Sequence, residues 1–214
     1  MMNWKRSTGK EQESLTFCSM QQKANLPERK PDMQTNSTHP TLNFPEIEPL
    51  LCDADYIDVA SAIGKGDLRT FVAGWITYQP AWMKPVLILR TIMLGRESSK
   101  KNGKGTSLTP QTVPMQAGEQ LSGWTVRQAE EDSYLIVEMH AKNQEAALSF
   151  VAEPLANQQK RFAVLLALHY VNQSGRRSFQ ILQPFHRLLD IVKTKAGMRA
   201  CGEVMPQVHY WRWR

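Results

Sequence analysis

Two histidines, His169 and His186, are the side chains of this sequence best suited to acid–base chemistry. Imidazole titrates near neutral pH, so either residue could serve as a general acid or base, or as a hydrogen-bond anchor for a ligand. A single histidine on a strand or helix is more often a structural residue whose ring nitrogens are already hydrogen-bonded. The sequence therefore offers both residues as catalytic candidates without establishing a reaction.

Two aspartates, Asp55 and Asp58, are of interest because paired carboxylates can divide acid and base roles between them. They lie three residues apart in a predicted strand, so their side chains point to opposite faces and cannot form a dyad with each other. We expect a cap at the end of the strand or a salt bridge to Arg176 instead.

Motifs for metals, phosphates and nucleophiles are missing or incomplete. No H-x-x-x-H or H-E-x-x-H spacing occurs, so we predict no metal site. The segment from Gly103 to Thr106 resembles part of a phosphate-binding loop but lacks the first glycine of that motif. There is no G-x-S-x-G elbow or dinucleotide fingerprint, and we expect no cofactor. The 3 cysteines are far apart and odd in number, which is typical of inert thiols.

The elements that would position these residues form a sheet with helices. Alternation predicts a first strand from Asp55 to Ala60, and two short helices follow, from Asp67 to Tyr78 and from about Ala81 to Leu94. Asp67 is a suitable N-cap for the first of them. Four further strands, separated by polar turns, predict an antiparallel meander: Gly123 to Gln128, Ser133 to Ala141, Ala146 to Glu153 and Arg161 to Val171.

The longest predicted element is an amphipathic helix from Ser174 to Gly197, with Ser174 as its N-cap and Gly197 as its C-cap. Pro184 lies inside this helix and should kink it near Gln180, whose carbonyl loses its usual donor. The apolar stripe that should face the sheet follows three- and four-residue steps through Phe179, Leu182, Phe185, Leu189 and Val192.

Composition divides the chain into a polar tail, one domain and a basic tail. Residues 1–44 are rich in Gln, Asn, Ser and Lys, which predicts a disordered tail. We expect one folded domain over residues 53–200 and a basic aromatic tail over residues 201–214. Residues 176–214 carry eight Lys and Arg against two Asp and Glu, so the basic excess of the chain lies at its C-terminal end, and nucleic acid or an anionic membrane surface is a candidate partner there.

Hydropathy argues against a membrane span or a secretory signal. No apolar stretch reaches the roughly 20 residues that a spanning helix needs. The N-terminus begins with basic residues but lacks the apolar core of a signal peptide. We therefore expect a cytoplasmic protein with no integral membrane association.

Three segments carry a family resemblance: DADYIDV, PAWMKPVLILRTIMLG and FAVLLALHYVNQSGRRSFQILQPFHRLLDIVKTKAG. They resemble the first strand, a helix and the C-terminal end of the bacterial domain-of-unknown-function family 2867 (DUF2867), over about Asp53 to Ala200. Phe179 departs from the resemblance, because a Tyr is expected there. The resemblance implies a START/Bet v 1-like helix-grip fold, shared with polyketide cyclases and lipid-transfer modules, and an apolar or amphipathic ligand. The matching positions are Asp55, Tyr56, Asp58, His169, Asn172, Gly175, Arg176, Pro184, Phe185, His186 and Arg187.

Taken together, these features predict an α+β helix-grip domain, in which a curved antiparallel sheet wraps around the long C-terminal helix after two short helices. The favoured hypothesis is binding of a small apolar or amphipathic molecule between sheet and helix. A cyclase- or isomerase-type enzyme that uses His169 or His186 as a base is an alternative, as is an interaction protein that docks through its basic C-terminal end. The expected ligand contacts are Tyr56, Trp75, Trp82, His169, Phe179, Leu182, Phe185 and His186, with Leu89 as a further wall residue.

Overall fold

The computed structural model describes residues 45–52, 54–85 and 108–213, and the chain divides into two units, residues 1–53 and 54–214. The described part of the first unit contains a short helix, α2 (Glu48–Cys52). Cys52 is disulfide-bonded, which corrects the expectation that the cysteines are all inert thiols. Cys201, in the second unit, is a free thiol.

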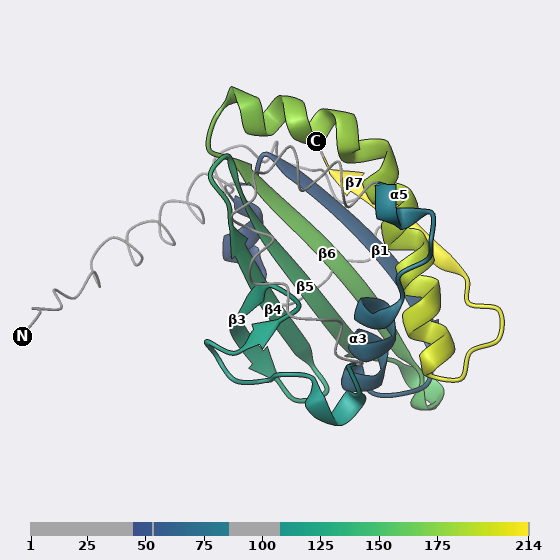
Figure 1. Cartoon of the computed structure of the whole chain (residues 1–214). Helices are drawn as coiled ribbons and strands as arrows, with labels where there is room; N and C mark the ends of the chain where they lie inside the picture. Colours follow the sequence, from purple (N-terminus) through teal and green to yellow (C-terminus); the bar gives the residue numbers. More distant parts are fainter. Residues whose placement is uncertain (1–44, 53, 86–107, 214) are drawn as a thin grey trace, which may run out of the picture. The chain divides into compact units, whose positions relative to one another are not determined.

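The second unit is built on a 7-stranded sheet with the order β2-β3-β4-β5-β6-β1-β7, in which every neighbouring pair is antiparallel (Figure 1). Together with a long C-terminal helix, this sheet confirms the predicted α+β class and is consistent with a helix-grip fold. All five strands predicted from alternation are present. The strands are β1 (Tyr56–Gly64), β2 (Gln120–Leu121), β3 (Trp124–Glu130), β4 (Tyr134–His140), β5 (Gln144–Pro154), β6 (Lys160–Tyr170) and β7 (Val208–Trp213).

Strand β7 comes from the aromatic and basic segment that we expected to be a tail. It pairs with β1, with Ala60 opposite Tyr210. Side chains alternate along a strand, so Tyr210 lies on the same face of the sheet as Ala60 and Asp58. His209 and Trp211 lie on the opposite face, where their ring centroids are 5.8 Å apart. The C-terminal end of the chain is therefore part of the sheet.

Helix α3 (Leu68–Thr77) covers one face of the sheet, which we call the inner face (Figure 1). It packs through two aromatic pairs, Phe71 with Phe162 at 4.9 Å between centroids and Trp75 with Phe150 at 5.1 Å. Its N-cap is Asp67, as predicted. The second predicted helix lies mostly outside the described residues, and only its start, at residues 83–85, is seen.

Helix α5 (Gln173–Ala200) packs on the same inner face and bends partway along its length, as expected from Pro184 (Figure 1). Its N-cap is Asn172 rather than the predicted Ser174, because the Asn172 side chain accepts a hydrogen bond from the Gly175 amide at 3.0 Å. Gly197 is not the C-cap, since the helix continues to Ala200. A Cβ at position 197 would lie 2.7 Å from Cδ2 of Phe71, so this glycine permits α3 and α5 to approach closely.

The buried side of α5 departs from the predicted apolar stripe after Leu182. Phe179 and Leu182 are buried, but Phe185 is 43% exposed. Beyond Leu182, the side chains that face the sheet are those of His186 and Asp190, which follow at steps of four residues and therefore lie on the same side of the helix. Polar residues thus occupy helix positions where an amphipathic pattern places apolar ones. The buried residues of this half are Asp190, Lys193, Thr194, Gly197 and Met198.

Candidate functional site

Five polar side chains meet between α5 and the inner face, and we call them the inner polar cluster: Tyr56 and Asp58 on β1, Asp190 and Lys193 on α5, and Tyr210 on β7. Asp58 is 1% exposed, Asp190 6% and Lys193 8%. Charged residues are rarely buried to this degree unless they are paired or functional. The cluster is therefore the strongest candidate site among the described residues.

Asp58 is held by two tyrosine hydroxyls. The hydroxyls of Tyr56 and Tyr210 both donate to Oδ2 of Asp58, at 2.7 and 2.9 Å. Burial, followed by the negative charge of Asp58, raises the pKa of Tyr56 to about 12 and raises the pKa of Tyr210 further. Both hydroxyls therefore keep their protons and act as donors that stabilise the Asp58 carboxylate.

Asp190 faces Asp58 and is the member of this carboxyl pair whose pKa is raised. Burial raises the pKa of Asp190 well above its usual range, and the charge of Asp58 adds to this, whereas Lys193 acts in the opposite direction. Hydrogen-bond contact with the Asp58 carboxyl acts in the same direction as burial and raises the pKa of Asp190 further. Since Asp58 already accepts two hydroxyl hydrogen bonds, the proton is assigned to Asp190.

Three buried polar atoms beside the cluster have no hydrogen-bond partner: Nε1 of Trp75, Oδ2 of Asp190 and Oγ1 of Thr194. Lys193 lies next to the first of these residues, because its Nζ is 4.1 Å from the centre of the Trp75 ring. An unsatisfied buried donor or acceptor costs about 1–3 kcal/mol. The inner face beneath α5 thus holds three buried polar groups that lack a hydrogen bond: an indole donor, a carboxyl oxygen and a hydroxyl.

The structure brings together several of the residues predicted to contact a ligand. The Phe179 ring lies 4.7 Å from that of Tyr56 and 5.2 Å from that of His186, measured between centroids. Trp75 and Leu182 are buried on the same side of the sheet. Tyr56 belongs to the inner polar cluster itself, so this part of the predicted wall adjoins the buried polar groups.

The other predicted contacts lie elsewhere. His169 follows Leu168 on β6, and Leu168 faces the core, so His169 points to the opposite face of the sheet. Its Nδ1 is 3.9 Å from Oδ2 of Asp55, which also accepts a hydrogen bond from the Tyr170 amide, so Asp55 caps the strand end. Trp82 is 41% exposed, Phe185 is exposed as well, and Leu89 lies outside the described residues.

Sequence reasoning missed Asp190, Lys193 and Tyr210. The usable signal for the first two was a conflict of patterns, because polar residues stand on the side of α5 that must be buried. For Tyr210 the signal was period-two alternation in the segment VHYWRW, which predicts a strand with Tyr210 and Val208 on one face. Asp58 was correctly separated from Asp55, but its partner lies on a distant helix.

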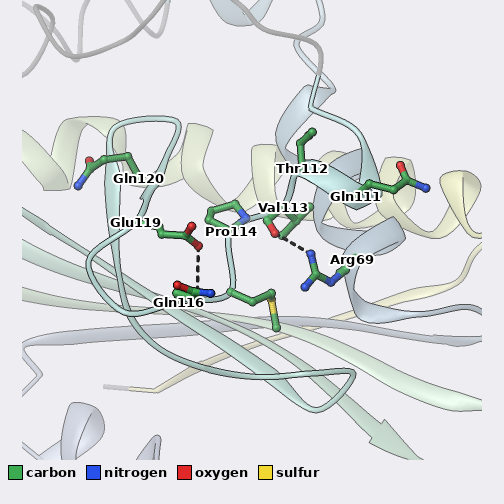
Figure 2. A pocket seen from close by; sticks show the side chains of 9 residues that line it. Arg69, Gln111, Thr112, Val113, Pro114, Gln116, Glu119 and Gln120 are labelled. Atoms are coloured by element: carbon green, nitrogen blue, oxygen red, sulfur yellow. Dashed lines mark hydrogen bonds between the residues drawn. The ribbon is translucent and has the colours of Figure 1, made fainter.

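A surface pocket of about 580 Å³ lies apart from the inner polar cluster (Figure 2). Its wall is mostly polar. On one side of it, the backbone N–H of Gln116 donates a hydrogen bond to Oε2 of Glu119 at 2.9 Å. A basic side chain, Arg69, gives it the strongest potential ligand contact. The lining residues are Arg69, Gln111, Thr112, Val113, Pro114, Met115, Gln116, Glu119 and Gln120.

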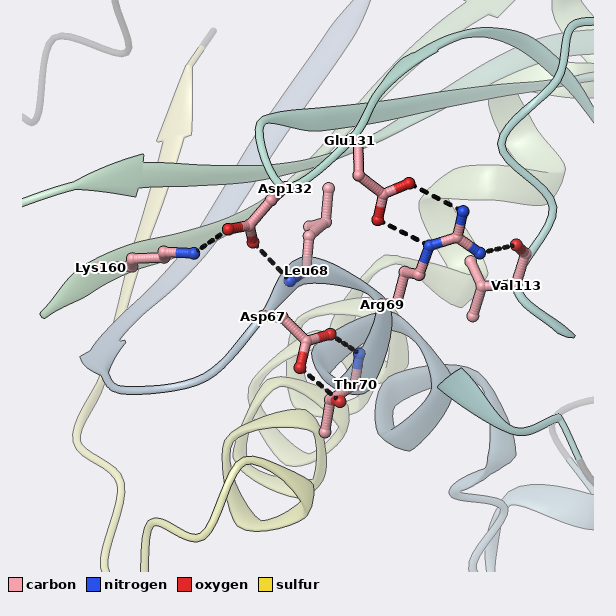
Figure 3. A network of polar contacts seen from close by, with 8 residues as sticks. All are labelled: Asp67, Leu68, Arg69, Thr70, Val113, Glu131, Asp132 and Lys160. Carbon is pink, nitrogen blue, oxygen red and sulfur yellow. Dashed lines mark hydrogen bonds and ion pairs between the residues drawn. The ribbon is translucent and has the colours of Figure 1, made fainter. Parts of the chain in front are cut away.

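Arg69 is already fully engaged in a structural network, which weakens the case for this pocket (Figure 3). Its Nε and Nη2 donate to the two carboxylate oxygens of Glu131 at 2.7 and 2.8 Å, and Nη1 donates to the Val113 carbonyl at 2.8 Å. Asp132 accepts a hydrogen bond from the Leu68 amide at 3.1 Å and pairs with Lys160. These contacts fix the start of α3 to the turn between β3 and β4.

Within residues 45–52, 54–85 and 108–213, no three or more His, Cys, Asp or Glu side chains gather in a way that could hold a metal ion. Likewise, none of the helices described is long and apolar enough to cross a membrane.

Comparison with known proteins yields one family. The model of a family described as "Protein of unknown function (DUF2867)" matches residues 48–192, more than half of the chain. The match includes β1 and most of α5, and so covers every member of the inner polar cluster except Lys193 and Tyr210. No curated protein and no solved structure matches the chain.

Proposed function

We propose that this chain, which belongs to the DUF2867 family, binds a small amphipathic molecule on the inner face of its sheet, beneath α5. The observation that carries the proposal is the group of buried, unpartnered atoms on Trp75, Asp190 and Thr194. These atoms lose water on folding and gain no protein partner in return. A polar group of a ligand would supply the missing hydrogen bonds.

The charges of the cluster favour an uncharged polar head on the ligand. Asp58 and Lys193 carry opposite charges, and the raised pKa of Asp190 favours its neutral form, so the buried charges of the cluster largely offset each other. The exposed Arg187 guanidinium lies at the edge of the cluster, 5.0 Å from the centre of the Tyr210 ring. A further buried ion would have no counter-charge and would bind at a large desolvation cost. A hydroxyl or carbonyl group can instead exchange hydrogen bonds with the indole, carboxyl and hydroxyl groups.

The apolar part of the ligand would lie against Phe179 and Leu182. The Phe179 ring now lies against the Tyr56 ring, so α5 must move away from the sheet when a ligand enters. Pro184 makes this motion less costly, because it has no N–H to donate to the Gln180 carbonyl and interrupts the helix hydrogen bonds. The resemblance to START-like helix-grip proteins supports the same location for a ligand.

Nile red, a neutral apolar dye with a carbonyl group, tests the proposal with the full-length chain. We expect saturable fluorescence enhancement that 1-decanol reverses at lower concentration than decanoate does. Thr194→Val, which removes the hydroxyl at nearly constant volume, should weaken dye binding several-fold. Ser149→Ala is the matched control, because Ser149 is another buried hydroxyl without a partner but lies on β5 with its side chain on the opposite face.

Absence of saturable dye binding, or an equal loss in the Thr194 and Ser149 variants, would contradict ligand binding at this site. Native mass spectrometry of the full chain purified from its own host gives an independent measurement. A co-purified small molecule that is retained by Ser149→Ala and lost from Thr194→Val is the expected result.

The carboxyl pair favours a second candidate, a proton-transfer enzyme of the isomerase type. Two acids whose environments push their pKa values apart can act as base and acid. Asp58 would remove a proton from the carbon next to a ligand carbonyl, while Asp190 would donate a hydrogen bond to the developing enolate oxygen. This assignment replaces His169, which lies on the opposite face of the sheet.

Deuterium exchange into the α-carbons of 2-decanone in heavy water separates the two candidates. An enzyme would accelerate exchange, and Asp58→Asn would abolish it while Nile red still binds. A binding protein would leave the exchange rate at its value in buffer.

A further inference from the structure

The outer side of α5 carries apolar side chains that face solvent. Ile181, Phe185 and Leu188 are 55%, 43% and 49% exposed. They are spaced four and three residues apart, so they lie on one side of the helix, away from the buried side that carries Phe179 and Asp190. A single exposed apolar side chain is ordinary, but three in adjacent turns form a patch.

The charged side chains at the surface of α5 are all basic. The only acidic residue between Gln173 and Ala200 is Asp190, which is buried beneath the helix. Arg177 precedes Ile181 by one turn and is exposed, and Arg199 is exposed in the last turn of α5, beyond the bend at Pro184. A positive charge thus lies one turn before the apolar patch, and another lies further along the same helix.

We propose that the α5 outer stripe, defined as Arg177, Ile181, Phe185, Leu188 and Arg199, docks the protein on an anionic lipid surface. A helix that lies in the membrane interface places its apolar side chains at the boundary of headgroups and acyl chains and its basic side chains near the phosphates. The stripe has both features in this order. The proposal does not depend on ligand binding beneath the helix.

A second copy of the chain fits the stripe less well than a lipid surface does. If two copies packed through their stripes, two α5 surfaces whose charged side chains are all basic would be brought together, in an antiparallel as in a parallel arrangement. Either arrangement juxtaposes like charges with no acid on the helix surface to offset them, which disfavours association.

Co-sedimentation of the full-length chain with sucrose-loaded vesicles tests the proposal. We expect about tenfold stronger partitioning to equimolar phosphatidylcholine and phosphatidylglycerol than to phosphatidylcholine alone, and loss of most of this difference in about 0.5 M salt. The double variant Phe185→Ser/Leu188→Ser should lose most of the binding. Arg177→Gln/Arg199→Gln should lower binding to the anionic vesicles and leave the weak binding to neutral vesicles unchanged.

Ile63→Ser is the matched control, because Ile63 is similarly exposed, at 44%, but lies on β1. All variants should retain the far-ultraviolet circular dichroism of the wild type, since every changed side chain is exposed. Equal binding to both kinds of vesicle, or unchanged binding by the double serine variant, would overturn the proposal. A dimer in native mass spectrometry that the double serine variant dissociates would overturn it too, because a second copy would then cover the stripe.

Discussion

The Asp190 carboxyl on α5 contacts the Asp58 carboxyl on β1, and burial together with the charge of Asp58 raises the pKa of Asp190, so Asp190 binds its proton more tightly in the folded state. The hydroxyls of Tyr56 and Tyr210 stabilise Asp58 as the charged partner. The proton therefore belongs to Asp190, and the contact depends on pH. This relationship links the stability of the fold to the same side chains that form the candidate site.

Asp190→Asn should make the protein increasingly more stable than the wild type as the pH rises from about 4. The folded state raises the pKa of Asp190, so it binds this proton more tightly than the unfolded chain does. The stability that this proton contributes is fully present when the pH is below the pKa of Asp190 in the unfolded chain. It is lost as the pH rises toward the pKa of Asp190 in the folded state, by at most about 1.4 kcal/mol per pH unit. Asparagine has no such proton. Urea unfolding at a series of pH values measures the difference.

Glu131→Gln is a control of opposite sign. The hydrogen bond from Arg69 lowers the pKa of Glu131, so the stability from this pair is present above the unfolded pKa and is lost as the pH falls through the folded one. The stability of the Gln variant should therefore fall furthest below that of the wild type near neutral pH, where the wild-type pair is fully formed. Parallel pH profiles for the wild type and Asp190→Asn would show that the folded state does not raise the pKa of Asp190.

Tyr210→Phe should reduce the free energy of unfolding by about 1–2 kcal/mol, because it removes one hydrogen bond to a buried carboxylate. The loss should shrink by about 1 kcal/mol in an Asp58→Asn background, which measures the coupling between strands β7 and β1. Trp211→Phe, on the same strand but on the opposite face, should cost the same in both backgrounds. Additive losses for Tyr210 and Asp58 would contradict the hydrogen bond between them.

Local patterns were sufficient to predict most of the fold. Period-two alternation predicted five strands to within a few residues, because each of them buries at least one apolar face. The start of α3 could be predicted from Asp67, because the first backbone N–H groups of a helix have no partner within it and an Asp side chain can accept a hydrogen bond from them. Asn172 was missed in favour of Ser174, since both residue types cap helices and the choice depends on where α5 meets the turn at Asn143.

The candidate site could be predicted only in part, because its contacts join residues that are distant along the chain. Alternation places Tyr56 and Asp58 on one face, and helical spacing places Asp190 and Lys193 on one side of α5. Neither pattern states which turn of the helix crosses which strand. His169 was grouped with His186 because both carry an imidazole suited to acid–base chemistry, whereas the strand alternation of β6 sends His169 to the opposite face.

Asp67→Ala should reduce the free energy of unfolding by about 1 kcal/mol. Asp67 accepts hydrogen bonds from the amide and the hydroxyl of Thr70, both at 2.8 Å, at the start of α3. Asp132 still accepts from the Leu68 amide in the variant, so the helix start keeps one cap and the loss stays moderate. Asp67→Asn retains the acceptor for the amide and should be nearly neutral. An equal loss in the two variants, measured by urea unfolding, would mean that charge and not capping is important there.

Gly197→Ala should destabilise the protein although alanine favours helix formation by about 1 kcal/mol. The new Cβ would lie 2.7 Å from Cδ2 and 2.8 Å from the carbonyl oxygen of Phe71, and a backbone atom of α3 cannot move without shifting the whole helix. Overpacking of this kind costs about 1–3 kcal/mol, so we expect a net loss of about 1 kcal/mol. In Gly74→Ala the new Cβ would lie 2.5 Å from the Cβ of Ala200, so this variant should lose a similar amount of stability. Arg199→Ala, exposed on the same helix, should change stability by less than about 0.5 kcal/mol. If Gly197→Ala were instead more stable than the wild type, α3 and α5 would have to lie further apart than the contact between Gly197 and Phe71 implies.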